Sequence, residues 1–147
     1  MQHIEYVSKA IELQKKGELE AAYKMYEKAL KLASGKAKLT ILHNQMVLAD
    51  AITELKRGKE REEWVNIEIH KAETLIHMCK DYPDDFRQLA MAHLFAGKAY
   101  IKKGLADRAK VHLSYAVEYA QQARDRQTSL DAVKEFQKVA KVSIQNL

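Results

Sequence analysis

Three residues, His70, Glu73 and His77, have the spacing and the side-chain chemistry of transition-metal ligands. Offsets of three, four and seven residues place them on one face of a helix, and imidazole and carboxylate groups both bind zinc. A complete site needs a fourth ligand from elsewhere, and no pattern in the sequence identifies one. We therefore predict a polar stripe beside the core, with no metal site and no cofactor.

Other residue patterns that carry catalysis are missing from the sequence. It contains no glycine-rich phosphate loop, no nucleophile elbow and no paired-cysteine zinc motif. The single cysteine, Cys79, excludes a disulfide within the chain, and we interpret it as a small apolar residue on a helix. We predict that the protein is not an enzyme.

Charge is distributed unevenly along the chain, whose formal net charge is +5 at pH 7. Residues 1–85 carry 14 Lys and Arg against 15 Asp and Glu, whereas residues 86–147 carry 11 against 5. A basic C-terminal half could attract nucleic acid or an acidic partner. Because its basic residues are spread singly along several helices, a solvated surface is the favoured interpretation, and a nucleic-acid contact is kept as the alternative.

The elements that must position these residues are helical. Five glycines and one proline among 147 residues are few for a turn-rich β fold, and hydrophobic residues make up 47% of the chain. The length fits one domain, so we predict a single all-α domain over residues 1–147. No apolar run approaches the ~20 residues of a membrane span, and the first residues lack a basic leader and an apolar core. We expect a cytoplasmic protein with no membrane segment.

Apolar residues recur every three to four positions in seven segments that are separated by glycine, proline or polar breaks. Gly17, Gly58 and Pro83 provide three of these breaks. A polar stretch precedes the last segment, and we expect Thr128 or Ser129 to cap that helix. The predicted helices span residues 2–16, 18–33, 37–57, 60–80, 85–103, 106–124 and 130–146.

A short phrase occurs twice, as Lys15-Lys16-Gly17 and as Lys102-Lys103-Gly104, each time between two predicted helices. Small and large residues surround both copies in a similar order. Such a repeat indicates helix pairs that pack closely through small residues, with large residues filling the space around them. The positions are Tyr6, Ala10, Leu13, Gly17, Leu19, Ala22, Tyr26, Ala29, Leu30 and Leu32 in the first copy, and His93, Gly97, Tyr100, Gly104, Ala109, Leu113, Ala116 and Tyr119 in the second.

On these residues the chain resembles the tetratricopeptide-repeat (TPR) family. The resemblance implies a right-handed superhelix of about three antiparallel helix pairs, followed by a C-terminal capping helix. The middle repeat departs from the family, because Gly58 lies 41 residues after Gly17 and 46 before Gly104, compared with about 34 residues in a standard unit. The implied units are repeat 1 at about 2–34, a divergent repeat 2 at about 37–80, repeat 3 at about 85–124 and the capping helix at about 130–146.

In TPR proteins the first helix of each pair lines a concave groove that holds a peptide or a helix of another protein. The resemblance therefore implies a noncatalytic adaptor or scaffold that binds a partner protein through a peptide or an amphipathic helix. The groove positions that it implies here are Val7, Ile11, Gln14, His43, Met46, Asp50, Met91, Leu94, Lys98 and Lys102.

Two features of these positions indicate the chemistry of the ligand. Met46, Met91 and Leu94 would supply adaptable apolar contacts, and Lys98 and Lys102 would orient a ligand of acidic character. Glutamate at both lysine positions should then weaken partner capture without unfolding the chain. The first and last units place apolar residues where a clamp for acidic chaperone tails needs polar ones, which argues against that function.

Overall fold

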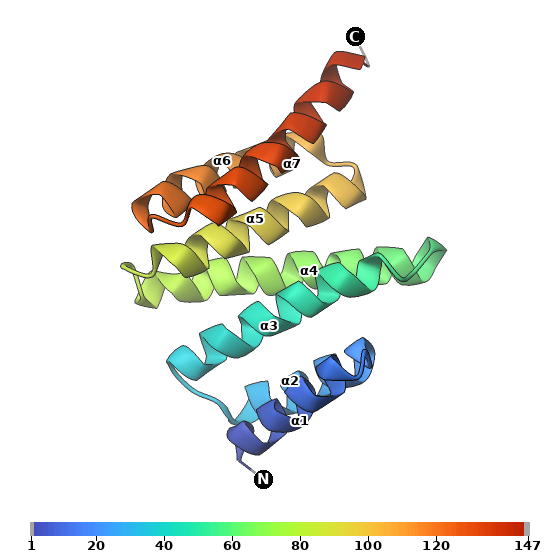
Figure 1. Ribbon diagram of the computed structural model, residues 1–147, viewed down its shortest axis with the longest axis vertical. Helices are drawn as coiled ribbons and strands as arrows, with labels where there is room; N and C mark the ends of the chain where they lie inside the picture. The colour runs from blue at the N-terminus through green and yellow to red at the C-terminus, as the bar shows by residue number, and fades with distance from the viewer. Residues whose placement is uncertain (1, 146–147) are drawn as a thin grey trace.

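The protein is a stack of α-helices, described over residues 2–145 in a computed structural model, with side chains described to Lys141 (Figure 1). No strand occurs within residues 2–145, so the all-α prediction is confirmed. The helices are α1 (His3–Lys15), α2 (Leu19–Leu32), α3 (Lys36–Thr53), α4 (Gly58–Met78), α5 (Phe86–Lys103), α6 (Ala106–Gln122) and α7 (Arg126–Gln145), with a short 3₁₀ helix, η1 (Cys79–Asp81), after α4. The predicted end of the last helix at residue 146 lies outside the described residues.

Consecutive helices pack side by side and follow one another along the long axis of the molecule (Figure 1). In the view of Figure 1, α1, α3 and α7 lie in front of α2, α4 and α6. Contacts also join α3 to α5 and α5 to α7, so alternate helices meet along one side of the stack. None of the described helices combines the length and the apolar character that crossing a lipid bilayer requires.

The repeated phrase forms the same turn in both places. Gly17 and Gly104 have φ values of +80° and +82°, in the left-handed region that favours glycine. The residue after each glycine donates its N–H to a helical carbonyl five residues back, Glu18 to Leu13 and Leu105 to Tyr100, at 2.9 Å in each case. This is a Schellman motif, which satisfies the last carbonyls of a helix.

The middle glycine has a different role, which explains the irregular spacing of the repeat. Helix α3 ends at Thr53, short of the predicted residue 57, and Gly58 is the first residue of α4. The glycine therefore starts the second helix of this pair, whereas Gly17 and Gly104 follow the end of a first helix.

The start of the last helix also differs from the prediction. Helix α7 begins at Arg126, and neither Thr128 nor Ser129 caps it. The carboxylate of Asp125 instead accepts a hydrogen bond from the backbone N–H of Thr128 at 3.2 Å and another from its hydroxyl at 2.6 Å. Asp125 is a preferred capping residue type, and its charge suits the positive end of the helix dipole.

Small residues allow the close approach of the first and last helix pairs. Ala10, Ala22 and Ala29 are fully buried between α1 and α2. In the last pair a Cβ atom built on Gly97 would lie 2.5 Å from Leu113 Cδ2, so even a methyl group does not fit there. Close packing through small residues is therefore confirmed for both pairs.

The buried apolar residues form two clusters that meet at α3. One cluster lies within α1, α2 and one side of α3, and the other runs from α3 to α7. Beside them, Glu27 of α2 accepts hydrogen bonds from Gln45 of α3 at 2.6 Å and from Lys71 of α4. We call these three residues the polar seam. It joins the first helix pair to the rest of the stack through a buried amide and a buried ammonium group.

Candidate partner-binding face

Helices α1, α3, α5 and α7 form what we call the odd-helix face, and their N-terminal halves line two adjoining hollows. The first hollow, of about 300 Å³, is lined by α1 and α3, and the second, of about 500 Å³, by residues from α3 to the start of α7. Thr40 lines both, so the hollows meet at this side chain. The first is lined by His3, Ile4, Val7, Ser8, Ala37, Thr40, Ile41 and Asn44, and the second by Thr40, His43, Asp85, Arg87, Gln88, Met91, Asp125, Gln127, Thr128 and Asp131.

Three of the implied groove residues line these hollows. Val7 lies in the first hollow, and His43 and Met91 lie together in the second although 48 residues separate them in the chain. A hydrogen bond of 3.0 Å joins Nδ1 of His43 to Oε1 of Gln88. Because an amide oxygen only accepts, the proton of this imidazole is on Nδ1 and its Nε2 is an acceptor. Burial lowers the pKa of His43, so the side chain is neutral at pH 7.

Two implied residues lie further along α1 and line neither hollow. Ile11 and Gln14 are both exposed. The hydroxyl of Tyr26 donates to Oε1 of Gln14 across 3.5 Å, a long contact that holds the amide against α2. These residues extend the odd-helix face beyond the first hollow.

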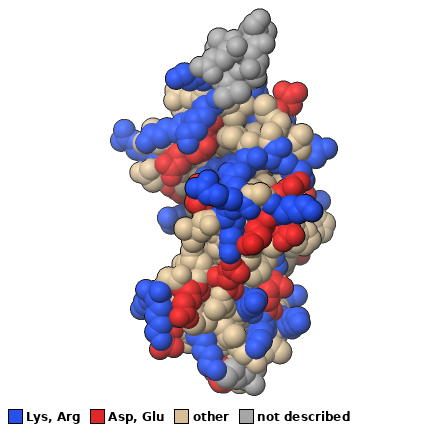
Figure 2. All heavy atoms as spheres, turned by 90° about the vertical axis from the view of Figure 1, so that its right-hand side faces the viewer, with Lys and Arg blue, Asp and Glu red and all other residues tan. Residues whose placement is uncertain are grey.

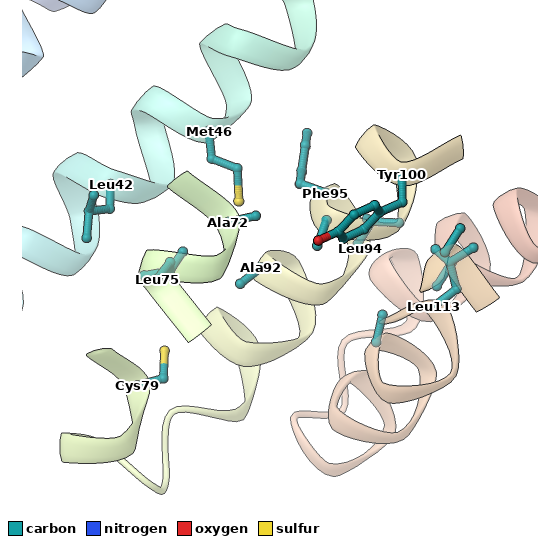
Figure 3. Close-up of a cluster of buried hydrophobic side chains, with 14 of the residues drawn as sticks. Leu42, Met46, Ala72, Leu75, Cys79, Ala92, Leu94, Phe95, Tyr100 and Leu113 are labelled. Atoms are coloured by element: carbon teal, nitrogen blue, oxygen red, sulfur yellow. The ribbon is translucent and has the colours of Figure 1, made fainter. Parts of the chain in front are cut away.

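The assignment of Met46 and Leu94 to partner contacts is wrong for the folded chain. Met46 is 0% exposed and Leu94 is 4% exposed, and both belong to the larger apolar cluster. Figure 3 shows Met46 of α3 pointing toward Ala72 of α4. The repeat frame predicts which helix lines the face, but adjacent positions on that helix point between it and its neighbours.

The three charged residues among the implied positions bind one another. Asp50 accepts hydrogen bonds from Lys98 Nζ at 3.0 Å and from Lys102 Nζ at 2.7 Å, and Lys102 also donates to the Thr53 hydroxyl at 2.7 Å and to Glu68 at 3.2 Å. We call these five residues the Lys102 cluster. It joins α3, α4 and α5, and only 10% of the Lys102 side chain is exposed.

Glu68 is the most deeply buried ionisable residue of the Lys102 cluster. Its side chain is 0% exposed, and its Oε2 has no hydrogen-bond partner within the described part of the chain. Burial, and then the neighbouring carboxylate of Asp50, raise the pKa of Glu68 to about 9. At pH 7 the group is therefore a neutral acid, and Asp50 carries the negative charge that both lysines bind.

These contacts overturn the expectation that Lys98 and Lys102 are free to orient an acidic ligand. Both ammonium groups already donate to a carboxylate of the same chain. Glutamate at the two positions would add two carboxylates beside Asp50 and Glu68. That double substitution would disrupt the junction of α3, α4 and α5, so it cannot test ligand binding alone.

Sequence reasoning predicted a packed contact for His93 but missed its partners. A hydrogen bond of 3.0 Å joins its Nδ1 to Nδ1 of His112, and Tyr115 and Tyr119 lie within 5.6 Å of the His93 ring between centroids. Burial, followed by the His112 imidazole, lowers the pKa of His93 to about 4. The three- and four-residue offsets from 112 to 115 to 119 were a signal, because they place these rings on one face of α6.

Two candidate reactive features were considered from the sequence: the possible metal ligands His70, Glu73 and His77, and the thiol of Cys79. Glu73 accepts a hydrogen bond from the Tyr100 hydroxyl, and His70 and His77 are exposed. Within residues 2–145, no group of three or more His, Cys, Asp or Glu is arranged to hold a metal ion. Cys79 is buried, and burial followed by the Asp85 charge raises its pKa to about 11, so it is a neutral thiol at pH 7.

The surface on the right-hand side of Figure 1 carries charges of both signs. Figure 2 shows lysine and arginine side chains interleaved with aspartate and glutamate over this side of the molecule. Between α3 and α4, Lys56 contacts Glu20 at 2.5 Å and Glu60 at 3.3 Å. This side does not present the continuous basic surface that favours a nucleic-acid backbone.

No protein-family model matches the chain, and no curated protein shows significant similarity to it.

Proposed function

We propose that the chain is a noncatalytic, TPR-like interaction module that binds a peptide or a helix of a partner protein on its odd-helix face. In this proposal the helix pairs form a right-handed superhelix, α7 is the capping helix, and the two hollows are the deepest part of the groove. The observation that carries the proposal is that two hollows meet at Thr40 and draw their lining from α1, α3, α5 and the start of α7.

The size and lining of the hollows support a ligand that is a segment of another protein. Hollows of about 300 and 500 Å³ hold several side chains, and a segment that lies across both would contact successive helices of the stack. Exposed apolar side chains are present on α1, where Ile4 is 61% and Ile11 is 42% exposed. Such side chains favour the apolar positions of an amphipathic segment.

Site-specific photocrosslinking tests the proposal. A photoreactive p-benzoylphenylalanine at Thr40, where the hollows meet, should give a crosslinked protein adduct in an extract of the native host. The matched control carries the same group at Glu118, an exposed residue of α6, which lines neither hollow.

The adducts are identified by mass spectrometry before and after nuclease treatment. Adducts at Thr40 that are absent at Glu118 and resist nuclease support a protein ligand on this face. Equal adducts at both positions, or none at Thr40, contradict the assignment. Nuclease-sensitive adducts would favour the nucleic-acid alternative instead.

A further inference from the structure

The charged groups that the odd-helix face offers to a ligand differ from those expected from the sequence. The two lysines that predicted an acidic ligand are held by Asp50. The second hollow, by contrast, is lined by three carboxylates, Asp85, Asp125 and Asp131, and by one guanidinium group, Arg87. The second hollow therefore has a formal excess of negative charge.

Two of the three carboxylates are partly compensated by the chain itself. Asp85 accepts from the backbone N–H of Gln88 at the start of α5, and Asp125 accepts from Thr128 at the start of α7. Positive helix ends offset part of both charges, and Arg87 lies 3.5 Å from Asp125. The Arg87 side chain is 78% exposed, so this ion pair is weak.

In the part of the chain that the structure describes, the carboxylate of Asp131 has no comparable compensation from a helix end or an ion pair. Within the described residues, its only hydrogen-bond partner is the amide Nε2 of Gln127, at 2.9 Å, and it has no ion-pair partner. A neutral amide donor does not balance a carboxylate. Asp131 also lines the second hollow, so a cation that enters this hollow meets a carboxylate without displacing an internal lysine or arginine.

The first hollow has a different character. No Asp, Glu, Lys or Arg lines it, and Ile4, Val7, Ala37 and Ile41 make most of its surface apolar. Because Thr40 lines both hollows, the apolar site and the anionic site lie on either side of α3. The anionic site extends from α3 past the start of α5 to Asp131 on α7.

We propose that the odd-helix face binds a protein segment that carries both an apolar side chain and a lysine or arginine. The apolar side chain occupies the first hollow, and the cation lies against Asp131 in the second. This inference rests on the proposed function and adds the charge and the direction of the ligand.

Selection from a display library of random 16-residue peptides on the full chain tests this inference. Enriched peptides are synthesised with a fluorescent label, and their affinities are measured by fluorescence anisotropy at low and at physiological salt. We expect the enriched peptides to combine Lys or Arg with Leu, Ile, Phe or Met. Affinity should fall as salt is added.

Three variants locate the binding site of the enriched peptides. Asp131→Lys and Ile4→Asp should each weaken binding by about tenfold or more, a loss typical of one good contact. Glu118→Lys makes the same charge change as Asp131→Lys, on α6, and should leave the affinity unchanged. Circular dichroism and thermal melting verify that each variant is folded.

The outcomes separate the charge preference from the docking face. Acidic or uncharged peptides that lose affinity with Ile4→Asp but not with Asp131→Lys would overturn the basic-ligand inference and leave the proposed function standing. Enriched peptides that bind all three variants like the wild type would overturn the docking face as well. A library that yields no enriched sequence would overturn both.

Discussion

The two copies of the Lys-Lys-Gly turn share one backbone conformation but have different surroundings. Gly17 and Gly104 have the same left-handed φ and the same pair of capping hydrogen bonds. Lys15 is nevertheless exposed, whereas the equivalent Lys102 is the centre of a buried cluster of charged and polar groups. The phrase thus determines the turn, and the neighbouring helices determine what its lysine does.

The position of each pair in the stack accounts for this difference. Helices α3 and α4 pack beside α5 and bring Asp50, Thr53 and Glu68 to Lys102. No helix precedes α1 within the described residues, so the equivalent end of the first pair has no such neighbours. One turn away, Lys98 binds Asp50, while the equivalent Ile11 is exposed.

The largest expected difference between the two copies concerns the lysines. Lys102→Met leaves the hydroxyl of Thr53 and the acid group of Glu68 without their shared donor and leaves Asp50 with Lys98 alone. We expect the free energy of unfolding to fall by about 3 kcal/mol, as for the loss of one partner from a buried ion pair. Urea denaturation followed by circular dichroism measures it.

Lys15→Met is the matched control and should change stability by no more than about 0.5 kcal/mol, because the side chain is exposed. Similar losses for the two variants would contradict the contrast between the turns.

The second expected difference concerns the closest approach within each pair. Alanine normally stabilises a helix relative to glycine by about 1 kcal/mol, but Gly97→Ala would force a methyl group against Leu113. We expect a net destabilisation of about 1–3 kcal/mol from overpacking. In a Leu113→Ala background the clash is absent, and the same substitution should instead be stabilising.

A double-mutant cycle measured by thermal unfolding gives the coupling between the two positions. Stabilisation by Gly97→Ala in the wild-type background would show that the approach of α5 and α6 is looser than described.

The third expected difference is in acid sensitivity. His93 has a folded pKa of about 4 against 6.5 for a free imidazole. As pH falls below 6.5 the unfolded chain takes up a proton that the folded chain excludes, so stability decreases until the pH reaches about 4. Between pH 7 and 4.5 the wild type should lose roughly 2 kcal/mol more than His93→Phe.

The equivalent residue of the first pair is Tyr6, a phenol in place of the imidazole. Urea denaturation of His93→Phe and Tyr6→Phe across the pH series checks the assignment. Only the first variant should flatten the profile, and parallel profiles for His93→Phe and the wild type would contradict it.

The smallest expected difference concerns a third turn of the same type. Arg124 has φ +56° at the end of α6, and the following N–H bonds to Ala120 at 2.8 Å, as in the two glycine turns. A left-handed conformation costs energy for residues that carry a Cβ atom. Arg124→Gly should therefore raise the thermal midpoint by the equivalent of about 0.5–1 kcal/mol.

Gly104→Ala is the reverse substitution and should lower the midpoint. No side chain lies within 4 Å of the added methyl group, so the change reports backbone strain alone. Opposite signs for the two variants are the expected result, and equal signs would exclude a common turn conformation.

The number and type of the helices could be predicted from the sequence. The boundary between α3 and α4 and the start of α7 could not. Apolar periodicity is a property of each segment, so all seven helices were found. The position of Gly58 was misinterpreted because glycine most often follows a helix, whereas Gly58 is the first residue of α4. Asp125 was missed as a cap because Thr128 and Ser129 are also acceptable capping residues.

The candidate site was predicted less completely, for a physical reason. Val7, His43 and Met91 could be placed because the repeat frame identifies the helices of one face. The pairing of Lys102 with Asp50 depends on packing between α3 and α5, which no local pattern encodes. Two of the acidic residues of the second hollow, Asp85 and Asp125, lie at helix starts, where capping alone explains an aspartate, and Asp131 lies further into α7 with no local pattern that marks it.

The polar seam has a consequence for how the stack opens. The first helix pair is joined to the remainder partly through Glu27, Gln45 and Lys71, groups that water can solvate when they separate. Undocking of this pair therefore exposes less apolar surface than disruption of the larger cluster, and amide hydrogens of α1 and α2 should exchange with solvent soonest. Since the first hollow lies between α1 and α3, the same motion abolishes it. A ligand there would slow amide exchange far from its own contacts.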